Sequence, residues 1–154
     1  MDFKTTRNRV LAAAVAATIA ATSAAALPMA ALGQDGEALV ETASDDLGTY
    51  LVGPEGLTLY YFTRDVTPGQ SVCSGGCLEA WPPLVAGEGQ ALVGGEGVSG
   101  TLATLTRDDG TMQVTYRGRP LYYWQGDTAA GETNGQGVND IWWVADVSGS
   151  LPTP

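Results

Sequence analysis

The sequence predicts an all-β domain, a compact antiparallel sandwich or small barrel built from two tandem hairpin repeats that pack about an approximate two-fold axis. Three observations support this prediction. The 154-residue chain nearly repeats ten of its residues, GLTLYYFTRD at 56–65 and GRPLYYWQGD at 118–127. Its apolar residues occur in short alternating runs, as strands require. Its 21 glycines favour turns and short strands over long helices.

The repetition extends beyond those ten residues. Residues 45–81 align with residues 107–143 at a constant offset of 62 positions without a gap. So regular a match indicates an internal duplication. The identical pairs are Asp46/Asp108, Gly48/Gly110, Thr49/Thr111, Val52/Val114, Gly56/Gly118, Leu59/Leu121, Tyr60/Tyr122, Tyr61/Tyr123, Asp65/Asp127, Gly69/Gly131, Gly75/Gly137 and Trp81/Trp143.

Each repeat predicts a β-hairpin. In the first, a strand at 49–52 leads through the turn GPEG into a strand at 57–62. In the second, a strand at 112–117 turns at Gly118 into a strand at 120–124. Further expected elements are strands at 100–107 and 141–147, one helical turn at 77–81, and a Gly-rich connection at 86–100 with a candidate short strand at 91–93.

Alternation along the second strand of each hairpin assigns its side chains to two faces. Leu59 and Tyr61 share one face, and Tyr60 and Phe62 share the other. The second repeat has the same pattern, with Leu121 and Tyr123 opposite Tyr122 and Trp124. Because both faces carry apolar bulk, we expect these strands to be covered on both sides, or to hold an aromatic cluster on one.

Residues 1–33 have the layout of a secretory signal peptide. Lys4, Arg7 and Arg9 precede an apolar, Ala-rich run at 10–27, followed by small residues suited to cleavage. We therefore expect export to the periplasm or beyond the cell, with a retained membrane anchor as the alternative. The predicted organisation is a signal peptide (1–33), a flexible lead-in (34–44), one β domain (45–149, with repeats at 45–85 and 101–149) and a tail (150–154).

The chain after residue 33 is strongly acidic. It holds four arginines, no lysine or histidine, and sixteen acidic residues, which gives a formal net charge of −12. Such a surface repels nucleic acids and anionic membranes, so neither is expected as a partner. An envelope protein or a small ligand remains a candidate partner, although a high negative charge also serves solubility alone.

The Tyr-x4-Asp pairs Tyr60/Asp65 and Tyr122/Asp127 are the first candidate site. Each aspartate begins an Asp-x3-Gly segment, where its carboxylate can accept backbone N–H groups of a turn. The favoured interpretation is structural, with the tyrosine hydroxyls bonded to the same turns. The alternative is a ligand site for a sugar or a cation. Without a histidine, general acid–base catalysis has little support, and we expect no enzyme activity.

Cys73 and Cys77 are the only cysteines, and a disulfide between them would close a five-residue loop. The second repeat has Gly135 and Asn139 in their place, so the bond would stiffen one loop and not define the fold. A soft-metal site lacks further ligands, and a thiol–disulfide exchanger lacks the usual setting. We therefore expect no metal and no cofactor.

The tryptophans and one acidic loop complete the candidates. Trp81 precedes two prolines and is expected to fill the core beside the disulfide, where Trp142 and Trp143 would mirror it and Trp124 would join the aromatic face. Exposure of a tryptophan would instead suggest a binding platform. The loop at 126–140 is rich in oxygen ligands, but it lacks the spacing of an EF-hand, so it is only a weak calcium candidate.

These motifs together resemble a known family. GLTLYYFTRD with SVCSGGCLEAWPPL, and the second copy from Arg107 to Val144, are similar to the bacterial secreted repeat family with a Tyr-x4-Asp motif, often called predicted lipoproteins. The resemblance covers nearly the whole chain after the signal segment. It implies an exported envelope protein with two repeats and carries no enzymatic activity. The lipidation cysteine of a lipoprotein is absent here.

Three functions follow as hypotheses. The leading one is a non-enzymatic, exported binding or structural module, since the duplication comes without a catalytic constellation. The second is a redox or electron-transfer accessory that cycles the Cys73–Cys77 pair. The third is a hydrolase that uses Asp65 or Asp127. If both carboxylates converge in an open cleft, binding is favoured; if each caps its own turn, it is not.

Overall fold

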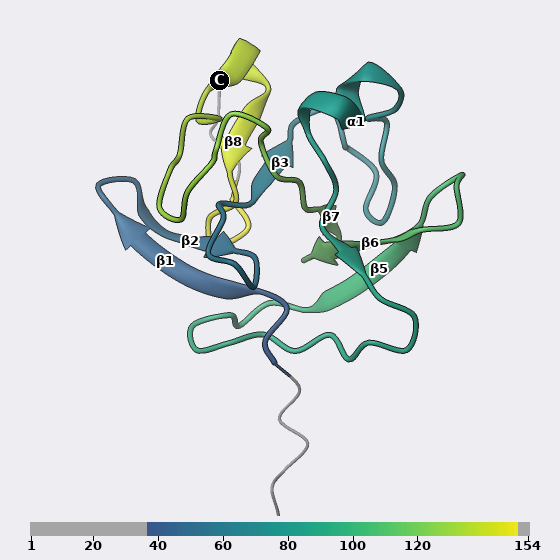
Figure 1. Cartoon of the computed structure of the whole chain (residues 1–154), viewed down its shortest axis with the longest axis horizontal. Helices are drawn as coiled ribbons and strands as arrows, with labels where there is room; N and C mark the ends of the chain where they lie inside the picture. The colour runs from purple at the N-terminus through teal and green to yellow at the C-terminus, as the bar shows by residue number, and fades with distance from the viewer. Residues whose placement is uncertain (1–36, 151–154) are drawn as a thin grey trace, which may run out of the picture. The chain divides into compact units, whose positions relative to one another are not determined.

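The computed structural model describes residues 37–150, and within them the fold is all-β (Figure 1). The predicted signal peptide and residues 151–154 of the tail lie outside the described residues. Among residues 37–150 no helix is both long and apolar enough to cross a membrane. The elements are β1 (Glu41–Asp45), β2 (Gly48–Val52), β3 (Tyr60–Phe62), α1 (Gly76–Ala80), β4 (Val85–Ala86), β5 (Leu102–Thr106), β6 (Met112–Tyr116), β7 (Arg119–Pro120), η1 (Val138–Asp140) and β8 (Trp142–Val144).

All paired strands run antiparallel, in small sheets that do not close into a barrel. β1 and β2 form one hairpin, and β5 and β6 form the equivalent hairpin on the opposite side (Figure 1). β6 also pairs with β4 and β7, and β3 pairs with β8. Of the two predicted architectures, a sandwich and a small barrel, the structure is therefore the sandwich, and it is built from two hairpin repeats.

The two repeats meet at an approximate two-fold axis that passes between Tyr60 and Tyr122. These residues are separated by the repeat offset and face one another as an antiparallel bridge. The Tyr60 N–H donates to the Tyr122 carbonyl at 2.8 Å, and the Tyr122 N–H donates to the Tyr60 carbonyl at 3.1 Å. A residue can pair reciprocally with its own counterpart only where a two-fold relation holds locally.

Each repeat sends its last strand into the other repeat. β8 belongs to the second repeat but pairs with β3 of the first, in the register Tyr61 to Trp143. β4 belongs to the first repeat but pairs with β6 of the second, in the register Val85 to Gln113. Neither repeat therefore completes its own sheet, so the two repeats fold as one unit.

The gap-free alignment of the repeats is wrong at two places. The β1–β2 turn has two residues between paired ends, Asp45 and Gly48, whereas the equivalent loop has three between Arg107 and Thr111. The register slips by one residue there and recovers at the next turn. The register shifts by one residue again before β8. The Ile141 carbonyl accepts the Thr63 N–H, and the Ala80 carbonyl accepts the Gln125 N–H in the same way. Ile141 therefore corresponds to Ala80, one residue away from the position that the constant offset predicts. The structural counterpart of Trp81 is consequently Trp142 and not Trp143.

The two faces assigned by alternation are confirmed as two apolar clusters. Leu59, Tyr61 and Leu121 lie in a cluster on one side, and Tyr60 and Tyr122 lie in a second cluster on the other. All five side chains are fully buried. Covered strands with bulk on both faces are what the sequence pattern predicts.

Three short segments differ from the sequence-based expectations. β1 begins at Glu41, inside the segment expected to be a flexible lead-in, and Leu39 and Val40 before it are buried. Four of its five residues (ETASD) are polar, and all five are at least partly exposed. They therefore show no alternation of apolar and polar residues, and pairing with β2 makes them a strand. β4 was not predicted, because two residues carry no pattern. The candidate strand at 91–93 is absent; only Gly94 forms an isolated bridge, to Val40.

Candidate functional site

The motif tyrosines and aspartates pair across the two-fold axis and not within their own motifs. The Tyr60 hydroxyl of the first repeat donates to Asp127 Oδ2 of the second at 2.5 Å. The Tyr122 hydroxyl donates in return to Asp65 Oδ2 at 2.6 Å. The Tyr-x4-Asp motif thus supplies one half of each of two reciprocal bonds, which we call the cross-repeat clamps.

Each clamp aspartate also organises the loop that follows it. Asp65 Oδ1 accepts the Val72 N–H at 2.8 Å, and Asp127 Oδ1 accepts the Asn134 N–H at 2.9 Å. Both contacts span seven residues of chain. Asp65 is 4% exposed and Asp127 is 7% exposed. The carboxylates therefore cap their own loops from inside the protein, and they do not converge in an open cleft.

Burial dominates the electrostatics of the clamps. It raises the pKa of Asp65, although the Tyr122 hydroxyl, the Val72 N–H and the Arg107 charge act in the opposite direction. It also raises the pKa of Asp127 against the Tyr60 hydroxyl and the Asn134 backbone. The pKa values of Tyr60 and Tyr122 are raised too, first by burial and then by their bonds to the carboxylates. Both tyrosines thus remain donors at ordinary pH.

A pH dependence of stability follows from the raised carboxyl pKa values. Protons bind the folded state more tightly than the unfolded chain, whose aspartates titrate at about pH 4. The stabilising contribution is therefore complete below that pH and is lost as pH rises through the folded pKa values. We expect the free energy of unfolding, measured with denaturant, to fall over this interval, and to fall less steeply in the Asp65→Asn/Asp127→Asn variant.

A matched control variant separates the titration of the clamp carboxyls from a general effect of removing negative charge. Asp46→Asn removes one negative charge at an exposed position and should keep most of the wild-type slope. An unchanged slope in the double variant would mean that the clamp carboxyls are not the groups that titrate.

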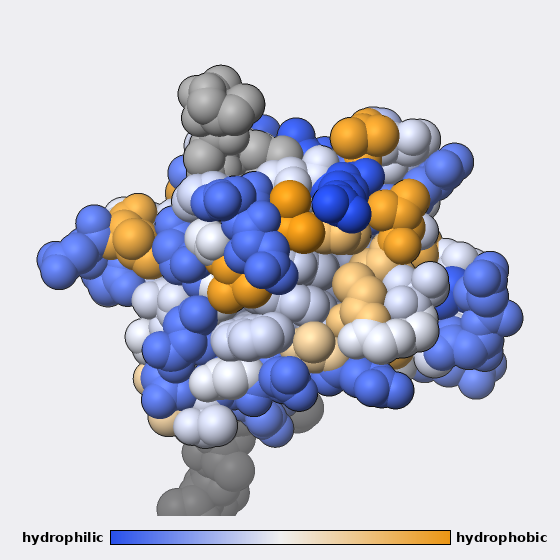
Figure 2. Space-filling model, turned by 90° about the horizontal axis from the view of Figure 1, so that it is seen from above, coloured by the Kyte–Doolittle hydropathy of each residue, from blue (hydrophilic) through white to orange (hydrophobic). Residues whose placement is uncertain are grey.

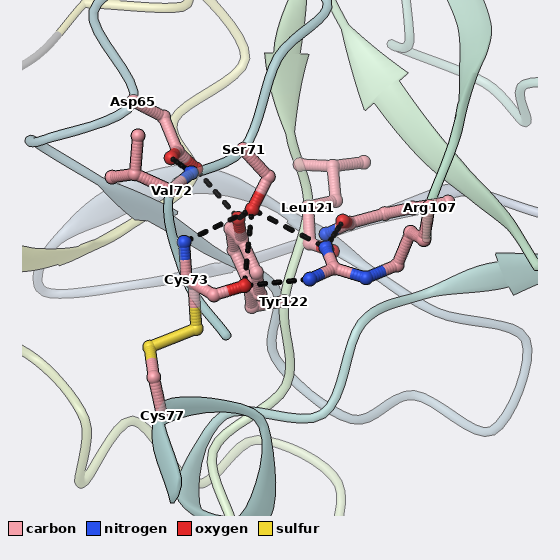
Figure 3. The surroundings of a disulfide bond; sticks show 9 residues. Asp65, Ser71, Val72, Cys73, Cys77, Arg107, Leu121 and Tyr122 are labelled. Atoms are coloured by element: carbon pink, nitrogen blue, oxygen red, sulfur yellow. Dashed lines mark hydrogen bonds between the residues drawn. A yellow bond between two sulfur atoms is a disulfide. The ribbon is translucent and has the colours of Figure 1, made fainter. Parts of the chain in front are cut away.

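The disulfide lies beside one clamp, and a polar network ties the two together (Figure 3). Cys73 and Cys77 are bonded, and the Cys73 N–H donates to Ser71 Oγ at 3.2 Å. Ser71 Oγ lies 2.6 Å from the Tyr122 hydroxyl. Because Tyr122 already donates to Asp65, the Ser71 hydroxyl donates to Tyr122. The loop from Asp65 to Cys77 is thus fastened at both ends.

Arg107 and Gln113 complete this network from the second repeat. Arg107 Nη2 donates to the Cys73 carbonyl at 2.6 Å, and Arg107 Nη1 donates to Ser71 Oγ at 3.2 Å and to Gln113 Oε1. Gln113 is fully buried and donates to the Leu121 carbonyl at 2.9 Å. Sequence reasoning missed both residues. The scarcity of basic residues after residue 33 was the one available signal for Arg107.

Removal of the disulfide should have a modest effect. For a five-residue loop, the chain-entropy estimate is about 2 kcal/mol of unfolding free energy, and the surrounding hydrogen bonds remain. We expect the Cys73→Ser/Cys77→Ser variant to fold and to lose no more than that amount in denaturant titrations. A chain that does not fold without the disulfide would contradict this prediction.

Four aromatic rings stack in a column that crosses the two-fold axis. Trp81 and Trp142 lie at the centre, with ring centroids 3.9 Å apart and planes 4° apart. Phe62 stacks outside Trp142 at 4.2 Å, and Trp124 packs outside Trp81 at 4.2 Å. Trp81 and Trp142 are buried, whereas Trp124 is partly exposed. Trp143 lies outside the column and is also partly exposed.

Gly135, the counterpart of Cys73, leaves no room for a side chain. A Cβ built there would lie 2.7 Å from two atoms of the Tyr60 ring and 3.0 Å from the Trp81 ring. We expect Gly135→Ala to lower the unfolding free energy by about 1–3 kcal/mol, as overpacking does. Gly76→Ala is the matched control because nothing lies within 4 Å of its Cβ position. Equal effects of the two variants would contradict the packing argument.

Two hollows lie between a motif loop and the first hairpin of the other repeat. One, of about 250 Å³, is lined by Ser71, Cys73 and Arg107 together with residues of β5. The other, of about 270 Å³, is lined by Leu47, Tyr50, Gln136, Trp143, Val144, Asp146 and Ser150, and we call it the Trp143 groove. A wider hollow of about 530 Å³, between β1 and residues 95–97, has no aromatic ring in its wall.

Two acidic side chains of the loop at 126–140, Asp127 and Glu132, accept hydrogen bonds from the loop itself. Glu132 Oε2 accepts the N–H groups of Thr128 and Ala129, which lowers the pKa of its carboxyl. Asp127 is part of a clamp. Across residues 37–150, no group of three or more Cys, Asp or Glu side chains is arranged to hold a metal ion.

The face that carries the motif loops is mixed in character. Figure 2 looks onto this face, where hydrophobic residues appear in several groups among hydrophilic ones. The loop after Asp65 contributes exposed apolar side chains, Val66 at 81% and Val72 at 63% exposure.

The fold and the clamps together define a protein made of two interlocked β repeats. The sequence matches Lipoprotein_15, a secreted repeat of unknown function, over residues 41–85 and again over 103–146. The matches cover more than half of the chain, so the protein belongs to this family and is a secreted protein with two copies of the repeat. No curated protein and no solved structure matches the chain.

Proposed function

We propose that the protein is a non-enzymatic binding module of the cell envelope, in which the Tyr-x4-Asp motif holds the two repeats together and the Trp143 groove receives the ligand. The observation that carries this proposal is that the hydroxyl oxygens of the motif tyrosines and the carboxylate oxygens of the motif aspartates all form hydrogen bonds inside the protein. Both aspartates are buried, and each carboxylate oxygen already accepts a hydrogen bond. A nucleophile or general base must reach a substrate, and burial at 4% and 7% exposure keeps these two carboxylates from one.

The Trp143 groove offers what the motif lacks. Its wall combines the partly exposed Trp143 ring with the hydroxyl-bearing Tyr50 ring, the Gln136 amide and the Asp146 carboxylate. The Val144 N–H donates to Gln136 Oε1 at 2.8 Å, which fixes this side chain and turns its amide NH2 into an oriented donor. An aromatic ring with polar groups around it suits a hydroxylated ring. We therefore propose one sugar ring of a polysaccharide as the ligand, since the volume is small for a larger group.

Tryptophan fluorescence tests this proposal. Titration with a panel of monosaccharides and short oligosaccharides should change the emission of the folded protein, and Trp143→Ala should abolish binding. Val72→Ala, an exposed apolar residue outside the groove, is the matched control and should bind as the wild type does. Asp65→Asn should lower stability and leave the affinity of the folded protein unchanged. The proposal is rejected if no sugar binds, or if Trp143→Ala binds normally.

A second candidate function is a redox accessory that uses the Cys73–Cys77 pair. The unequal exposure of the two cysteines favours it: Cys73 is 1% exposed, whereas Cys77 is partly exposed, so an external thiol would attack Cys77. The reduction potential of the pair, measured against glutathione or dithiothreitol, decides the matter. A value below about −300 mV would place the bond among inert structural disulfides and exclude this function.

A further inference from the structure

We propose that the aromatic column and the clamps together form a one-electron relay. A cationic one-electron oxidant, such as an oxidised metal complex, takes an electron from Trp124 at the surface. The electron is replaced from Tyr60 or Tyr122 inside the protein, and the hydroxyl proton of that tyrosine passes to the aspartate of its clamp. The relay requires neither a ligand in the Trp143 groove nor a change in the Cys73–Cys77 disulfide.

The rings are in contact from the surface to both clamps. Trp124 is partly exposed and lies 4.2 Å from Trp81, which stacks on Trp142 at 3.9 Å. Tyr60 meets the Trp81 ring edge-on at 5.4 Å. Tyr122 meets the Trp142 ring in the same way at 5.1 Å. Electrons tunnel readily between aromatic rings in such contact, and indole and phenol are the aromatic side chains that lose one electron most easily.

The two ends of the column differ in chemistry, although the two-fold axis relates them. Phe62 and Trp124 are separated by the repeat offset and form the equivalent outer rings. Phe62 is 7% exposed, and its benzene ring is far harder to oxidise than an indole. Within the column, Trp124 is therefore the ring that an oxidant can reach and oxidise. The strongly acidic chain attracts cationic oxidants to this surface.

Each clamp holds the base that oxidation of a tyrosine requires. A phenol that loses an electron becomes strongly acidic, so at neutral pH its proton passes to an acceptor. Asp127 accepts the Tyr60 hydroxyl at 2.5 Å, and the second clamp repeats this arrangement at 2.6 Å. In the step, the Tyr60 O–H bond breaks, an O–H bond forms on Asp127, and the electron refills the oxidised tryptophan. The products are a neutral tyrosyl radical, a neutral carboxylic acid and an oxidant reduced by one electron.

The surroundings of the clamps favour these neutral products. Burial raises the pKa of both clamp aspartates, which makes their carboxylates better proton acceptors. Each tyrosine oxygen also has a second donor that stays in place after the proton has left. The Gly135 N–H donates to the Tyr60 oxygen at 3.1 Å, and Ser71 Oγ lies 2.6 Å from the Tyr122 oxygen. Both tyrosines are fully buried, which shields the radical from water.

The neighbouring residue in β3 lacks such an acceptor. Tyr61 is as fully buried as Tyr60, but its hydroxyl has no hydrogen-bond partner among residues 37–150. Without a base in reach, this hydroxyl cannot release its proton. The two adjacent tyrosines therefore provide a matched pair, in which burial is equal and only the clamp differs.

Flash photolysis of the full chain tests the entry to the relay. A ruthenium polypyridyl complex, excited in the presence of a quencher, supplies the cationic one-electron oxidant. Transient absorption and electron paramagnetic resonance distinguish tryptophan from tyrosyl radicals. We expect a tryptophan radical that is replaced by a tyrosyl radical, and loss of most of the tyrosyl signal in Trp124→Phe. The proposal is overturned if the wild type forms no tyrosyl radical, or if Trp124→Phe leaves its yield unchanged.

Clamp variants test the source of the electron and the destination of the proton. Tyr60→Phe/Tyr122→Phe should retain the tryptophan radical and lose the tyrosyl radical. Asp65→Asn/Asp127→Asn should give the same result with both tyrosines present, because the proton acceptors are gone. Near-ultraviolet circular dichroism verifies that each variant is folded. A tyrosyl radical that persists at the wild-type yield in either folded variant overturns the proposal.

Tyr61→Phe is the matched control for the clamp variants. It removes one buried hydroxyl that has no partner among residues 37–150, so the tyrosyl yield should remain that of the wild type. Loss of the tyrosyl radical in this variant would place the radical outside the clamps and overturn the proposal. Because Trp124→Phe leaves both clamps intact, the test of entry remains decisive even if a clamp variant does not fold.

Discussion

Trp81→Ala is expected to lower the free energy of unfolding by about 3–5 kcal/mol, the usual effect of removing a large buried aromatic side chain. The ring is 4% exposed and lies at the centre of the aromatic column, between Trp142 and Trp124. It also meets the Tyr60 ring edge-on at 5.4 Å. Loss of this ring leaves a cavity at the two-fold axis, where both repeats depend on the same contacts. Equilibrium denaturation monitored by circular dichroism measures the effect.

The two adjacent tryptophans of the second repeat provide the matched comparison. Trp142→Ala should be about as destabilising as Trp81→Ala, because Trp142 is the counterpart of Trp81 across the axis and is 2% exposed. Trp143→Ala should cost clearly less, since this ring is partly exposed and stands outside the column. The gap-free sequence alignment predicts the opposite order for the two residues. A larger effect of Trp143→Ala would therefore contradict the counterpart assignment.

Tyr122→Phe should lower the free energy of unfolding by about 1–3 kcal/mol, because it leaves the buried Asp65 carboxylate without one of its donors. The same change at Tyr60 should have a comparable effect through Asp127. The combination of both changes loosens both cross-repeat clamps and should sum to about 2–6 kcal/mol, large against the stability of an ordinary small domain. Thermal and denaturant unfolding of the single and double variants measures these effects.

A pair of double-mutant cycles separates the crossed arrangement from a local one. The cycle of Tyr122→Phe with Asp65→Asn joins residues of different repeats and should show a coupling energy of about 0.5–3 kcal/mol. The cycle of Tyr60→Phe with Asp65→Asn joins residues of the same motif that make no hydrogen bond to one another. Its coupling should lie within error of zero. Coupling within the motif and none across the repeats would refute the clamps.

The strand pattern could be predicted because it depends on local periodicity. Alternation placed Leu59 and Tyr61 on one side and Tyr60 and Phe62 on the other, and the two apolar clusters contain them in that division. β1 escaped detection because four of its five residues are polar and all are at least partly exposed, so the strand needs no alternation. Its existence depends on the partner strand β2, and pairing with a distant segment leaves no mark on the strand itself.

The role of the motif could be predicted only in part. Asp-x3-Gly predicted that Asp65 and Asp127 accept backbone N–H groups of the turns they begin. The carboxylates do accept N–H groups of the following loops, but the donors are Val72 and Asn134, seven residues on and beyond the Asp-x3-Gly segments. That the tyrosines bond the aspartates of the other repeat could not be predicted, because any arrangement of two repeats contains the same residues. Ser71, Arg107 and Gln113 were missed for the same reason: their bonds join the loop after Asp65 to the β5–β6 hairpin of the other repeat.

The sequence by itself determined the duplication, the antiparallel β class, the faces of the central strands and the family of secreted repeats. All of these depend on the order and spacing of residues along the chain. Only the tertiary structure decided that the tyrosine of each motif bonds the aspartate of the other motif. It also decided that Trp142 is the counterpart of Trp81, and that Trp143 lines the Trp143 groove and stays outside the aromatic column. Those facts depend on one-residue differences in turn length and on contacts across an axis of symmetry, which a linear pattern does not record.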